Sequence, residues 1–164
     1  MPFTQSCIQM IRPPSGAAQR IHTGWREWLA LPELGIPAIK AKIDTGARTS
    51  ALHSYRVAPF RKRGKFMVRF DIHPLQARTD VTLNCSAELV DRRWVSDSGG
   101  HRELRYVIRT LLRLGGSEWP IEVTLTNRDP MRFRMLLGRT AMHGRVNVIP
   151  DASYLLGKAP TIQI

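Results

Sequence analysis

The chain of 164 residues is long enough for one domain with a substantial hydrophobic core. Its hydrophobic content of 43% is ordinary for a soluble protein, and no apolar run is long enough to span a membrane, so we expect no membrane association. The net charge of +12, carried largely by arginine, favours a polyanionic partner, although a solvated basic surface would give the same count.

Both chain ends are expected to be tails around a single domain. Residues 1–21 include the run Pro-Pro-Ser-Gly-Ala-Ala, which is typical of a flexible lead-in, and they lack the charged start and apolar core of a secretory signal. The domain is predicted over residues 22–157, with a C-terminal tail at 158–164. The two cysteines are too few for a disulfide framework, which favours reduced thiols and a cytoplasmic location.

Alternating apolar and polar residues, typical of β-strands, dominate the sequence. They predict strands at residues 36–43, 65–72 and 81–90. The basic run at residues 61–65 contains a glycine and comes just before the second of these strands. We interpret this run as a hairpin turn, with a nucleic-acid-binding patch as the alternative. Short segments separated by Gly and Pro indicate an all-β barrel or sandwich.

One hairpin can be predicted with its register. Residues 104–114 and 117–126 flank Gly115 and Gly116, and a two-residue Gly-Gly turn suits the tight hairpin types that need positive φ. The only convincing helical segment is short, at residues 139–143, and ends before a glycine.

This register has a consequence for charged side chains. It sets Arg113 opposite Glu118 and Arg109 opposite Glu122, and such cross-strand pairs stabilise by about 0.2–1 kcal/mol each. Arg105 lies on the same face opposite a threonine. We therefore expect Arg105 to be unpaired and available to bind a ligand.

The run Asp-Thr-Gly at residues 44–46 directly follows the first predicted strand. A strand leading into this triplet is how aspartic proteases present their catalytic carboxylate, although the triplet alone is also typical of an ordinary turn. The run Leu-Leu-Gly at residues 136–138 supplies the two large apolar residues and glycine that such enzymes place behind the Asp loop. Residues 96–101, between the two runs, form a polar, Gly-rich tip where a flap would lie. This order resembles one retropepsin protomer.

Longer stretches resemble one bacterial family, the retropepsin-like family labelled ATP-dependent zinc protease and associated with ATP-grasp ligases that modify ribosomal protein S6. The matching stretches, within residues 24–157, are 24–28 with 31–32, 40–53, 97–102, 125–128 and 136–142. The resemblance implies an all-β, closed retropepsin-like (acid protease) barrel with a short C-terminal helix. Each chain would be one protomer of a two-fold dimer.

The resemblance also implies roles for single residues. Asp44 would be catalytic, Thr45 would hydrogen-bond across the two-fold axis, and the Gly46 N–H would bind the carboxylate. Further substrate contacts are expected after the triplet and at the flap tip. Arg105 joins this set because the hairpin register leaves it unpaired, and Arg48 and Arg139 join it because they depart from the viral pattern. This set is Ala47, Arg48, Ser98, Gly99, Gly100, His101, Arg105 and Arg139.

Aspartic-protease chemistry needs two carboxylates that share one proton, because like charges that close cannot both ionise easily. The chain carries a single Asp-Thr-Gly run. We therefore expect a homodimer with an Asp44 from each copy on the axis, which hydrolyses peptide bonds. One alternative is a non-catalytic module of the same fold that binds acidic peptides or a ribosomal partner. A metal-dependent hydrolase is the other.

One position departs from the viral retropepsins, which usually carry an acid two residues after the triplet's glycine, paired with the arginine of a Gly-Arg motif. Here the two positions are Arg48 and Arg139, and two cations without an anion between them are costly when partly buried. Either the geometry differs, or an acid such as Glu103 or a substrate carboxylate lies between them. The last case predicts that both arginines bind an acidic peptide, for example a glutamate-rich tail.

Zinc and ATP, which the family label names, have no supporting motif. The five histidines form no His-Glu-x-x-His, the two cysteines have no paired spacing, and no Gly-x-x-x-x-Gly-Lys-Ser/Thr run exists. We therefore predict no cofactor and no metal ligand. A metal site formed by His53, His143 and Asp44 is the alternative.

Overall fold

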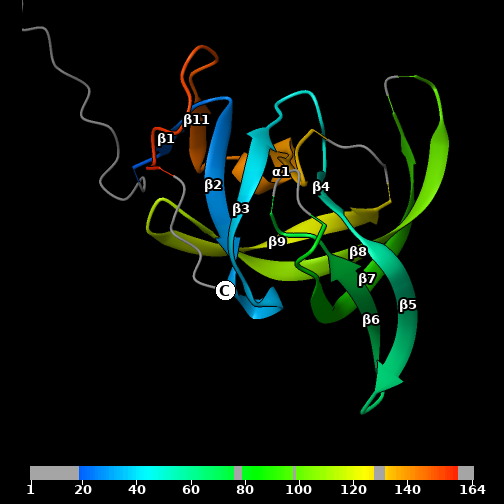
Figure 1. Ribbon diagram of the computed structural model, residues 1–164. Coiled ribbons are helices and arrows are strands. Elements are labelled where there is room, and N and C mark those ends of the chain that lie inside the picture. Colours follow the sequence, from blue (N-terminus) through cyan, green and yellow to red (C-terminus); the bar gives the residue numbers. More distant parts are fainter. Residues whose placement is uncertain (1–18, 76–78, 98, 128–131, 159–164) are drawn as a thin grey trace, which may run out of the picture.

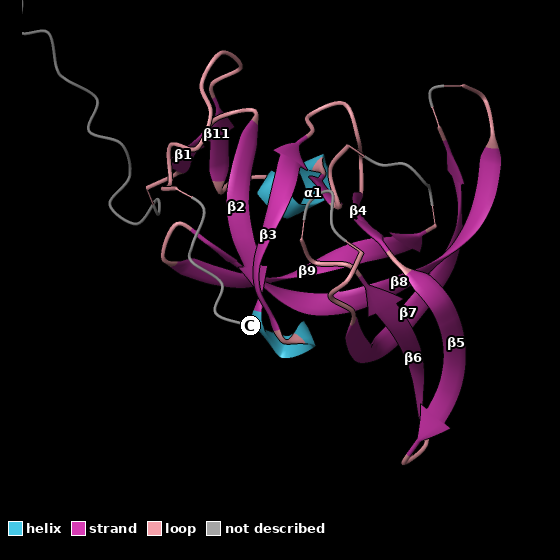
Figure 2. Ribbon diagram, viewed as in Figure 1, coloured by secondary structure: helices cyan, strands magenta, loops and turns pink. Residues whose placement is uncertain are grey.

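The computed structural model describes residues 19–75, 79–97, 99–127 and 132–158, and most of its regular structure is β-strand (Figure 2). The expected tails at residues 1–21 and 158–164 therefore lie mostly outside the described residues. None of the described helices is long and apolar enough to cross a membrane. In chain order the elements are β1 (Ile21–Thr23), β2 (Arg26–Leu31), the 3-10 helix η1 (Pro32–Leu34), β3 (Ile36–Ile43), β4 (Ser50–His53), β5 (Tyr55–Lys62), β6 (Lys65–Ile72), β7 (Leu83–Ser96), β8 (Arg102–Leu114), β9 (Ser117–Thr126), β10 (Met135–Leu137), α1 (Arg139–Met142) and β11 (Val146–Val148).

The main sheet closes on itself. Its nine strands follow the order β2-β3-β10-β4-β9-β8-β7-β6-β5, and an additional pairing of β2 with β8 joins Ala30 to Arg113. That pairing closes a barrel of the strands β2, β3, β10, β4, β9 and β8. The strands β7, β6 and β5 extend the sheet beyond the barrel (Figure 1). The predicted all-β closed barrel with one short helix near the C-terminus is therefore confirmed.

Left-handed turn residues shape two long hairpins. Gly115 and Gly116, with φ of 57° and 81°, join β8 to β9. Arg63 and Gly64, with φ of 51° and 77°, join β5 to β6 in the same way. Positive φ at both central residues matches the right-handed twist of the paired strands. Both turns lie where the sequence predicts them.

The predicted register of the β8–β9 hairpin is confirmed, since Arg113 pairs with Glu118 and Arg109 with Glu122. The Arg113 guanidinium donates a hydrogen bond to the Glu118 carboxylate. Glu122, however, accepts a hydrogen bond at 2.9 Å from Arg93 of β7. The register is therefore correct, but Glu122 forms its ion pair with Arg93 of β7, the neighbour of β8 in the sheet, rather than with Arg109.

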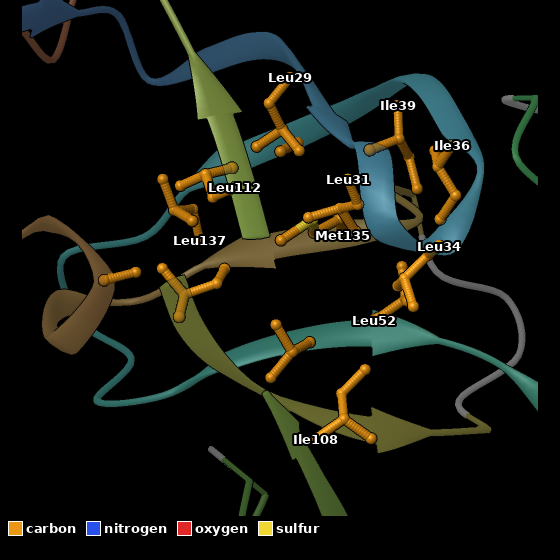
Figure 3. Packing of buried hydrophobic residues seen from close by; sticks show 14 of the residues in the cluster. Leu29, Leu31, Leu34, Ile36, Ile39, Leu52, Ile108, Leu112, Met135 and Leu137 are labelled. Atoms are coloured by element: carbon orange, nitrogen blue, oxygen red, sulfur yellow. The ribbon is translucent and has the colours of Figure 1, made fainter. Parts of the chain in front are cut away.

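The barrel interior is a continuous apolar core supplied by facing strands (Figure 3). Ile39 of β3, Leu52 of β4, Ile108 of β8 and both Met135 and Leu137 of β10 have no solvent-exposed surface. β10 has only three residues, yet two of them lie in this core. The core therefore fixes the strand that carries the Leu-Leu-Gly run.

A buried carboxylate fastens the C-terminal segment to the barrel. Glu27 of β2 has no exposed surface, and its oxygens accept N–H bonds from Gly24, Leu155 and Leu156 at 2.8, 3.0 and 3.0 Å. A Cβ on Gly24 would lie 2.1 Å from the Ala152 carbonyl oxygen, so this position requires glycine. Residues 24–28, one of the stretches that resemble the bacterial family, therefore hold Leu155 and Leu156 against the barrel.

The described thiol, Cys85 of β7, should be unreactive in the folded protein. Burial, followed by the nearby Asp71 carboxylate, raises the pKa of Cys85 to about 11, and its thiol donates to the Leu34 carbonyl at 3.3 Å. In a Cys7→Ser variant, which leaves Cys85 as the only cysteine, we expect a disulfide reagent at pH 8 to label no thiol until denaturant is added. Rapid labelling of the native protein would contradict this.

The same shift predicts a pH dependence of stability. The folded state holds the Cys85 proton more tightly than the unfolded state, where the thiol ionises near pH 8.5. Ionisation of Cys85 therefore leaves the free energy of unfolding unchanged below about pH 8.5 and lowers it as pH rises from there toward 11. Denaturant titrations should show that this alkaline loss of unfolding free energy is smaller in Cys85→Ala than in the wild type, each measured against its own value at pH 7.

Candidate active site

The position of β10 brings the two sequence runs together. β10 pairs in parallel with β3, where Leu137 faces Ile43, and antiparallel with β4, where Leu136 faces Ala51. The residues that follow β3 and β10 therefore emerge side by side at one edge of the sheet. The Asp44 N–H donates to the Leu137 carbonyl at 2.8 Å, which ties the start of the Asp loop to β10.

Gly138 makes this approach sterically feasible. A Cβ at this position would lie 2.6 Å from the Thr49 carbonyl carbon and 2.8 Å from its oxygen, which are both backbone atoms. The Gly138 N–H instead donates to the Ser50 hydroxyl at 3.0 Å. Position 138 must therefore be glycine because the backbone of Thr49 packs directly against it.

The loop from Asp44 to Arg48, which we call the Asp loop, is held mainly by backbone hydrogen bonds. The Gly46 N–H donates to Asp44 Oδ1 at 3.0 Å, as expected. On the other side of the loop, the N–H groups of Arg139 and Thr140 donate to the carbonyls of Ala47 and Arg48 at 2.8 and 3.0 Å. These hydrogen bonds hold the Asp loop, and with it the Asp44 carboxylate, against the residues that follow β10.

The Asp44 side chain is a quarter exposed (25%), and Lys42 Nζ lies 3.9 Å from Oδ2. Because Lys42 is itself nearly half exposed, this pair is screened by water and contributes little. Thr45 and Gly46 are exposed at the top of the loop. The carboxylate is therefore accessible from solvent and from any partner that covers the loop.

Arg48 and Arg139 do not share an acid among the residues that the structure describes. The Arg139 guanidinium donates to the Thr45 carbonyl at 3.0 Å and so braces the Asp loop directly, while both arginines are exposed. The Arg139 contact with a backbone carbonyl differs from the viral ion pair, and a substrate carboxylate at Arg48 stays a prediction. Glu103, the internal acid suggested for this gap, binds Arg105 instead, at 2.9 Å.

Arg105 is therefore not unpaired, and that expectation was wrong. Its side chain is buried, its Nε donates to Glu103 Oε2, and the Thr126 hydroxyl donates to the same oxygen at 3.2 Å. Residues two apart on a strand share a face, so Glu103 could have been recognised as the partner from the sequence. Arg105 still lines the cleft described below, but with its charge balanced.

The flap is the hairpin tip between β7 and β8. Asp97 Oδ1 accepts N–H bonds from Gly99 and His101, each at 2.9 Å, and Gly100 has a φ of 83°. His101 Nδ1 lies 3.5 Å from Asp97 Oδ2 in a largely exposed position. Ser98 lies outside the described residues. The conformation of the flap tip is thus held by hydrogen bonds to the Asp97 carboxylate.

A cleft of about 990 Å³ lies between the Asp loop and the β7 arm of the flap. Gly99, Gly100 and His101 are not among the residues that line it, whereas Asp97 is. Of the expected site residues, the cleft combines Asp44, Gly46, Ala47, Arg48 and Arg105. Its other lining residues are Lys42, Thr49, Ala51, Arg93, Trp94, Val95, Ser96, Glu122, Thr124, Leu136 and Thr140.

Sequence reasoning missed the β7 arm, which forms one wall of the cleft. Trp94 is 62% exposed there, and a tryptophan so close to a Gly-rich tip was a usable signal. Arg93 lies opposite Arg105 in the register, and each is neutralised by its own acid. The hydrogen bonds that Arg93 donates to Glu122 and, second, to Asp91 raise the pKa of Arg93, so this cation is permanently charged and already paired.

The histidines considered for a metal site lie apart from the cleft lining. His53 is buried at the end of β4, and His143 is exposed at the C-terminal end of α1, where its N–H donates to the Arg139 carbonyl. Across the described ranges, no group of three or more His, Cys, Asp or Glu side chains is arranged to hold a metal ion.

The steric role of Gly138 can be tested by mutation. Gly138→Ala should lower the free energy of unfolding by about 1–3 kcal/mol, because the new Cβ collides with backbone that cannot move away. Gly99→Ala is the control, since its Cβ would meet only side-chain atoms of Asp97 and His101 at 3.3 Å. Equal losses for both variants in chemical denaturation would contradict this role.

Comparisons with known proteins agree with this geometry. A family model described as RimB-like, retropepsin-like aspartic endopeptidase RimB, matches residues 22–159. Two curated relatives, each named probable alpha-L-glutamate ligase, come from Shewanella pealeana (46% identity, 86% of this chain) and Parasynechococcus marenigrum (48% identity, 85% of this chain). The match covers only 31% and 30% of those relatives, so this chain spans less than a third of their length.

A solved structure shares the fold. It is a protein of unknown function from Legionella pneumophila, with a TM-score of 0.70 and 24% identity, and the match covers 84% of this chain and 99% of that one. The family model spans the Asp loop, the flap and Gly138. The resemblance inferred from the sequence is confirmed, and the chain belongs to the RimB-like family of retropepsin-like aspartic endopeptidases.

Proposed function

We propose that the chain is an aspartic peptidase that works as a symmetric homodimer, with the Asp44 carboxylates of two copies as its catalytic dyad. The observation that carries this proposal is a carboxylate held by the Gly46 N–H and accessible in a large cleft between the Asp loop and the β7 arm of the flap. The description of the family as a retropepsin-like aspartic endopeptidase supports the same reaction.

The second carboxylate would have to come from a second copy. Among the described residues that line the cleft, the acids other than Asp44 are Asp97 and Glu122. Asp97 binds the backbone of the flap tip, and Glu122 binds Arg93. A two-fold axis beside the exposed Thr45 would bring an equivalent Asp44 into reach, which is how one short chain can supply a symmetric site.

The proposed reaction uses the two carboxylates in different protonation states. The ionised Asp44 takes a proton from a water molecule, whose oxygen attacks the peptide carbonyl carbon, while the protonated Asp44 donates its proton to the carbonyl oxygen. The tetrahedral intermediate then collapses. The carboxyl that took the water proton passes it to the nitrogen, the C–N bond breaks, and the amine leaves. One hydroxyl of the intermediate returns its proton to the other, ionised Asp44, so that a carboxylic acid forms and the dyad again holds one proton.

Several contacts would position this dyad without taking part in proton transfer. The Gly46 N–H orients Oδ1, and the Arg139 guanidinium holds the Thr45 carbonyl at 3.0 Å. Arg139 is therefore better described as a positioning residue than as a direct substrate contact. The β7 arm, with its exposed Trp94, would cover a bound peptide and limit the access of water.

We further propose that the peptide substrate is acidic. Arg48 lines the cleft, is exposed, and takes part in none of the ion pairs found among the described residues, unlike Arg93 and Arg105. A planar guanidinium binds carboxylates through two parallel hydrogen bonds. The name of the relatives, probable alpha-L-glutamate ligase, supports a peptide that contains glutamate.

The dyad is tested by Asp44→Asn on a library of acidic peptides. The amide cannot cycle a proton, so cleavage should fall by more than about a hundredfold, the lower range for general acid–base catalysis. Wild-type activity should have a bell-shaped pH dependence and should survive a metal chelator. Thr140→Ser, which changes one methyl group at the cleft wall, is the matched control and should retain activity.

Other outcomes distinguish the alternatives. Loss of wild-type cleavage with chelator, restored by added zinc, would favour a metal-dependent hydrolase. If wild type and Asp44→Asn both bind acidic peptides with equal affinity and neither cleaves them, the non-catalytic module is the better account.

The acidic specificity is tested separately by Arg48→Glu. Reversing this charge should raise KM for an acidic peptide by about three- to tenfold and leave KM for a neutral peptide unchanged, since exposed charges contribute modestly. Arg145→Glu has the same change in net charge at an exposed site outside the cleft. Equal effects of the two variants would attribute any loss to overall charge and would contradict a role for Arg48.

A further inference from the structure

The β5–β6 hairpin projects away from the barrel. It follows β7 at the far end of the sheet, so its outer strand, β5, is an edge (Figure 1). Its Arg63-Gly64 turn and the flap tip point to opposite ends of the molecule in the same view. No residue from 55–72 lines the cleft. The hairpin therefore forms a surface that is separate from the candidate active site.

The hairpin is strongly basic. Its cations are all exposed, and they are Arg56, Arg61, Lys62, Arg63, Lys65 and Arg69. Its single acid, Asp71, is buried, accepts a hydrogen bond from Asn84 and lies 3.7 Å from Arg56. None of the ion pairs found among the described residues uses a cation from positions 61–69. The tip is therefore a concentration of positive charge that the protein itself does not neutralise.

Aromatic rings accompany these charges. The Arg61 guanidinium lies 4.4 Å from the centroid of Phe66, and the Arg69 guanidinium lies 5.0 Å from that of Phe60. Phe66 is 57% exposed although its neighbours on the same face of β6 are buried. Charges on an edge strand can simply prevent strand-to-strand aggregation. That explanation does not account for an exposed phenylalanine on β6, which is an inner strand.

A pocket beside the hairpin adds a third feature. It has a volume of about 480 Å³ and combines Lys62, Arg63 and Lys65 with the apolar side chains of Met67 and Leu34. Two acids, Glu33 and Glu88, also line it. Phe66 does not line this pocket, because it lies on the other face of β6 from Lys65 and Met67. A basic tip with an apolar wall on one face and an exposed ring on the other suits a strand with regularly spaced phosphates and flat bases that wraps the tip.

We propose that the β5–β6 hairpin binds a single strand of nucleic acid, with the basic tip on the phosphates and Phe66 stacked on a base. Counterion release from the phosphates supplies the sequence-independent part of the affinity. Stacking on an aromatic ring supplies the part that an acidic polypeptide cannot reproduce. This binding does not depend on the proposed peptidase activity.

The test measures fluorescence anisotropy of a labelled uridine oligomer of about 12 nucleotides, as RNA and as DNA, between about 50 and 200 mM salt. The tip variant is Lys62→Gln with Arg63→Asn and Lys65→Gln, which leaves both arginine–phenylalanine contacts intact, and asparagine tolerates the positive φ at position 63. The control variant neutralises three exposed cations outside the hairpin, its pocket and the cleft, by Arg20→Gln, Arg145→Gln and Lys158→Gln. Thermal melting checks the fold of both.

We expect the tip variant to lose at least about tenfold in affinity, with the salt slope shallower by about 2, while the control with the same net charge loses much less. Phe66→Ala should weaken binding by about five- to a hundredfold without changing the salt slope. Equal losses in tip and control variants would overturn the proposal, as would a wild type that binds neither oligomer. If poly-glutamate competes as well as RNA and Phe66→Ala has no effect, the surface binds acidic protein instead, and the proposal is wrong.

Discussion

The architecture of the site depends on one close contact, that of the Gly138 backbone against the Thr49 carbonyl. This contact lets β10 lie between β3 and β4, with two of its three residues in the core. Once β10 is there, the Asp44 N–H reaches the Leu137 carbonyl, and the residues after Gly138 hold the other side of the Asp loop. The catalytic candidate is thus positioned by barrel packing, by backbone hydrogen bonds and by the Arg139 guanidinium on the Thr45 carbonyl.

The charges around the cleft are arranged in separate, locally balanced groups. Arg93 is neutralised by Asp91 and Glu122, and Arg105 by Glu103. Asp44 is an accessible carboxylate whose contact with Lys42, at 3.9 Å, is screened by water. Arg48 is an exposed lining cation outside the ion pairs found among the described residues. A site with one such carboxylate per chain is chemically incomplete for aspartic-protease catalysis, and completing it by two-fold symmetry requires no further residue type.

Much of the fold and the Asp loop could be predicted because their signals are local. Gly-Gly fixes the β8–β9 register, alternation fixes β6, and the Asp-Thr-Gly and Leu-Leu-Gly runs identify the two halves of the site. The errors concern partners chosen in three dimensions. Glu122 binds Arg93 because β7 continues the sheet beyond β8, and Arg139 binds a backbone carbonyl, which no pattern of charges indicates. The Glu103–Arg105 pair was an avoidable omission, since both residues lie on one face of one strand.

The central claim is that two chains build one dyad, and mixed dimers test it most directly. Wild type and Asp44→Asn would be mixed in varying proportions, allowed to exchange subunits, and assayed on an acidic peptide at fixed total protein. If both carboxylates of a dimer are required, activity should fall with the square of the wild-type fraction, to about a quarter at equal mixing. A linear fall, to about half at equal mixing, would mean that each chain acts alone and would contradict the account.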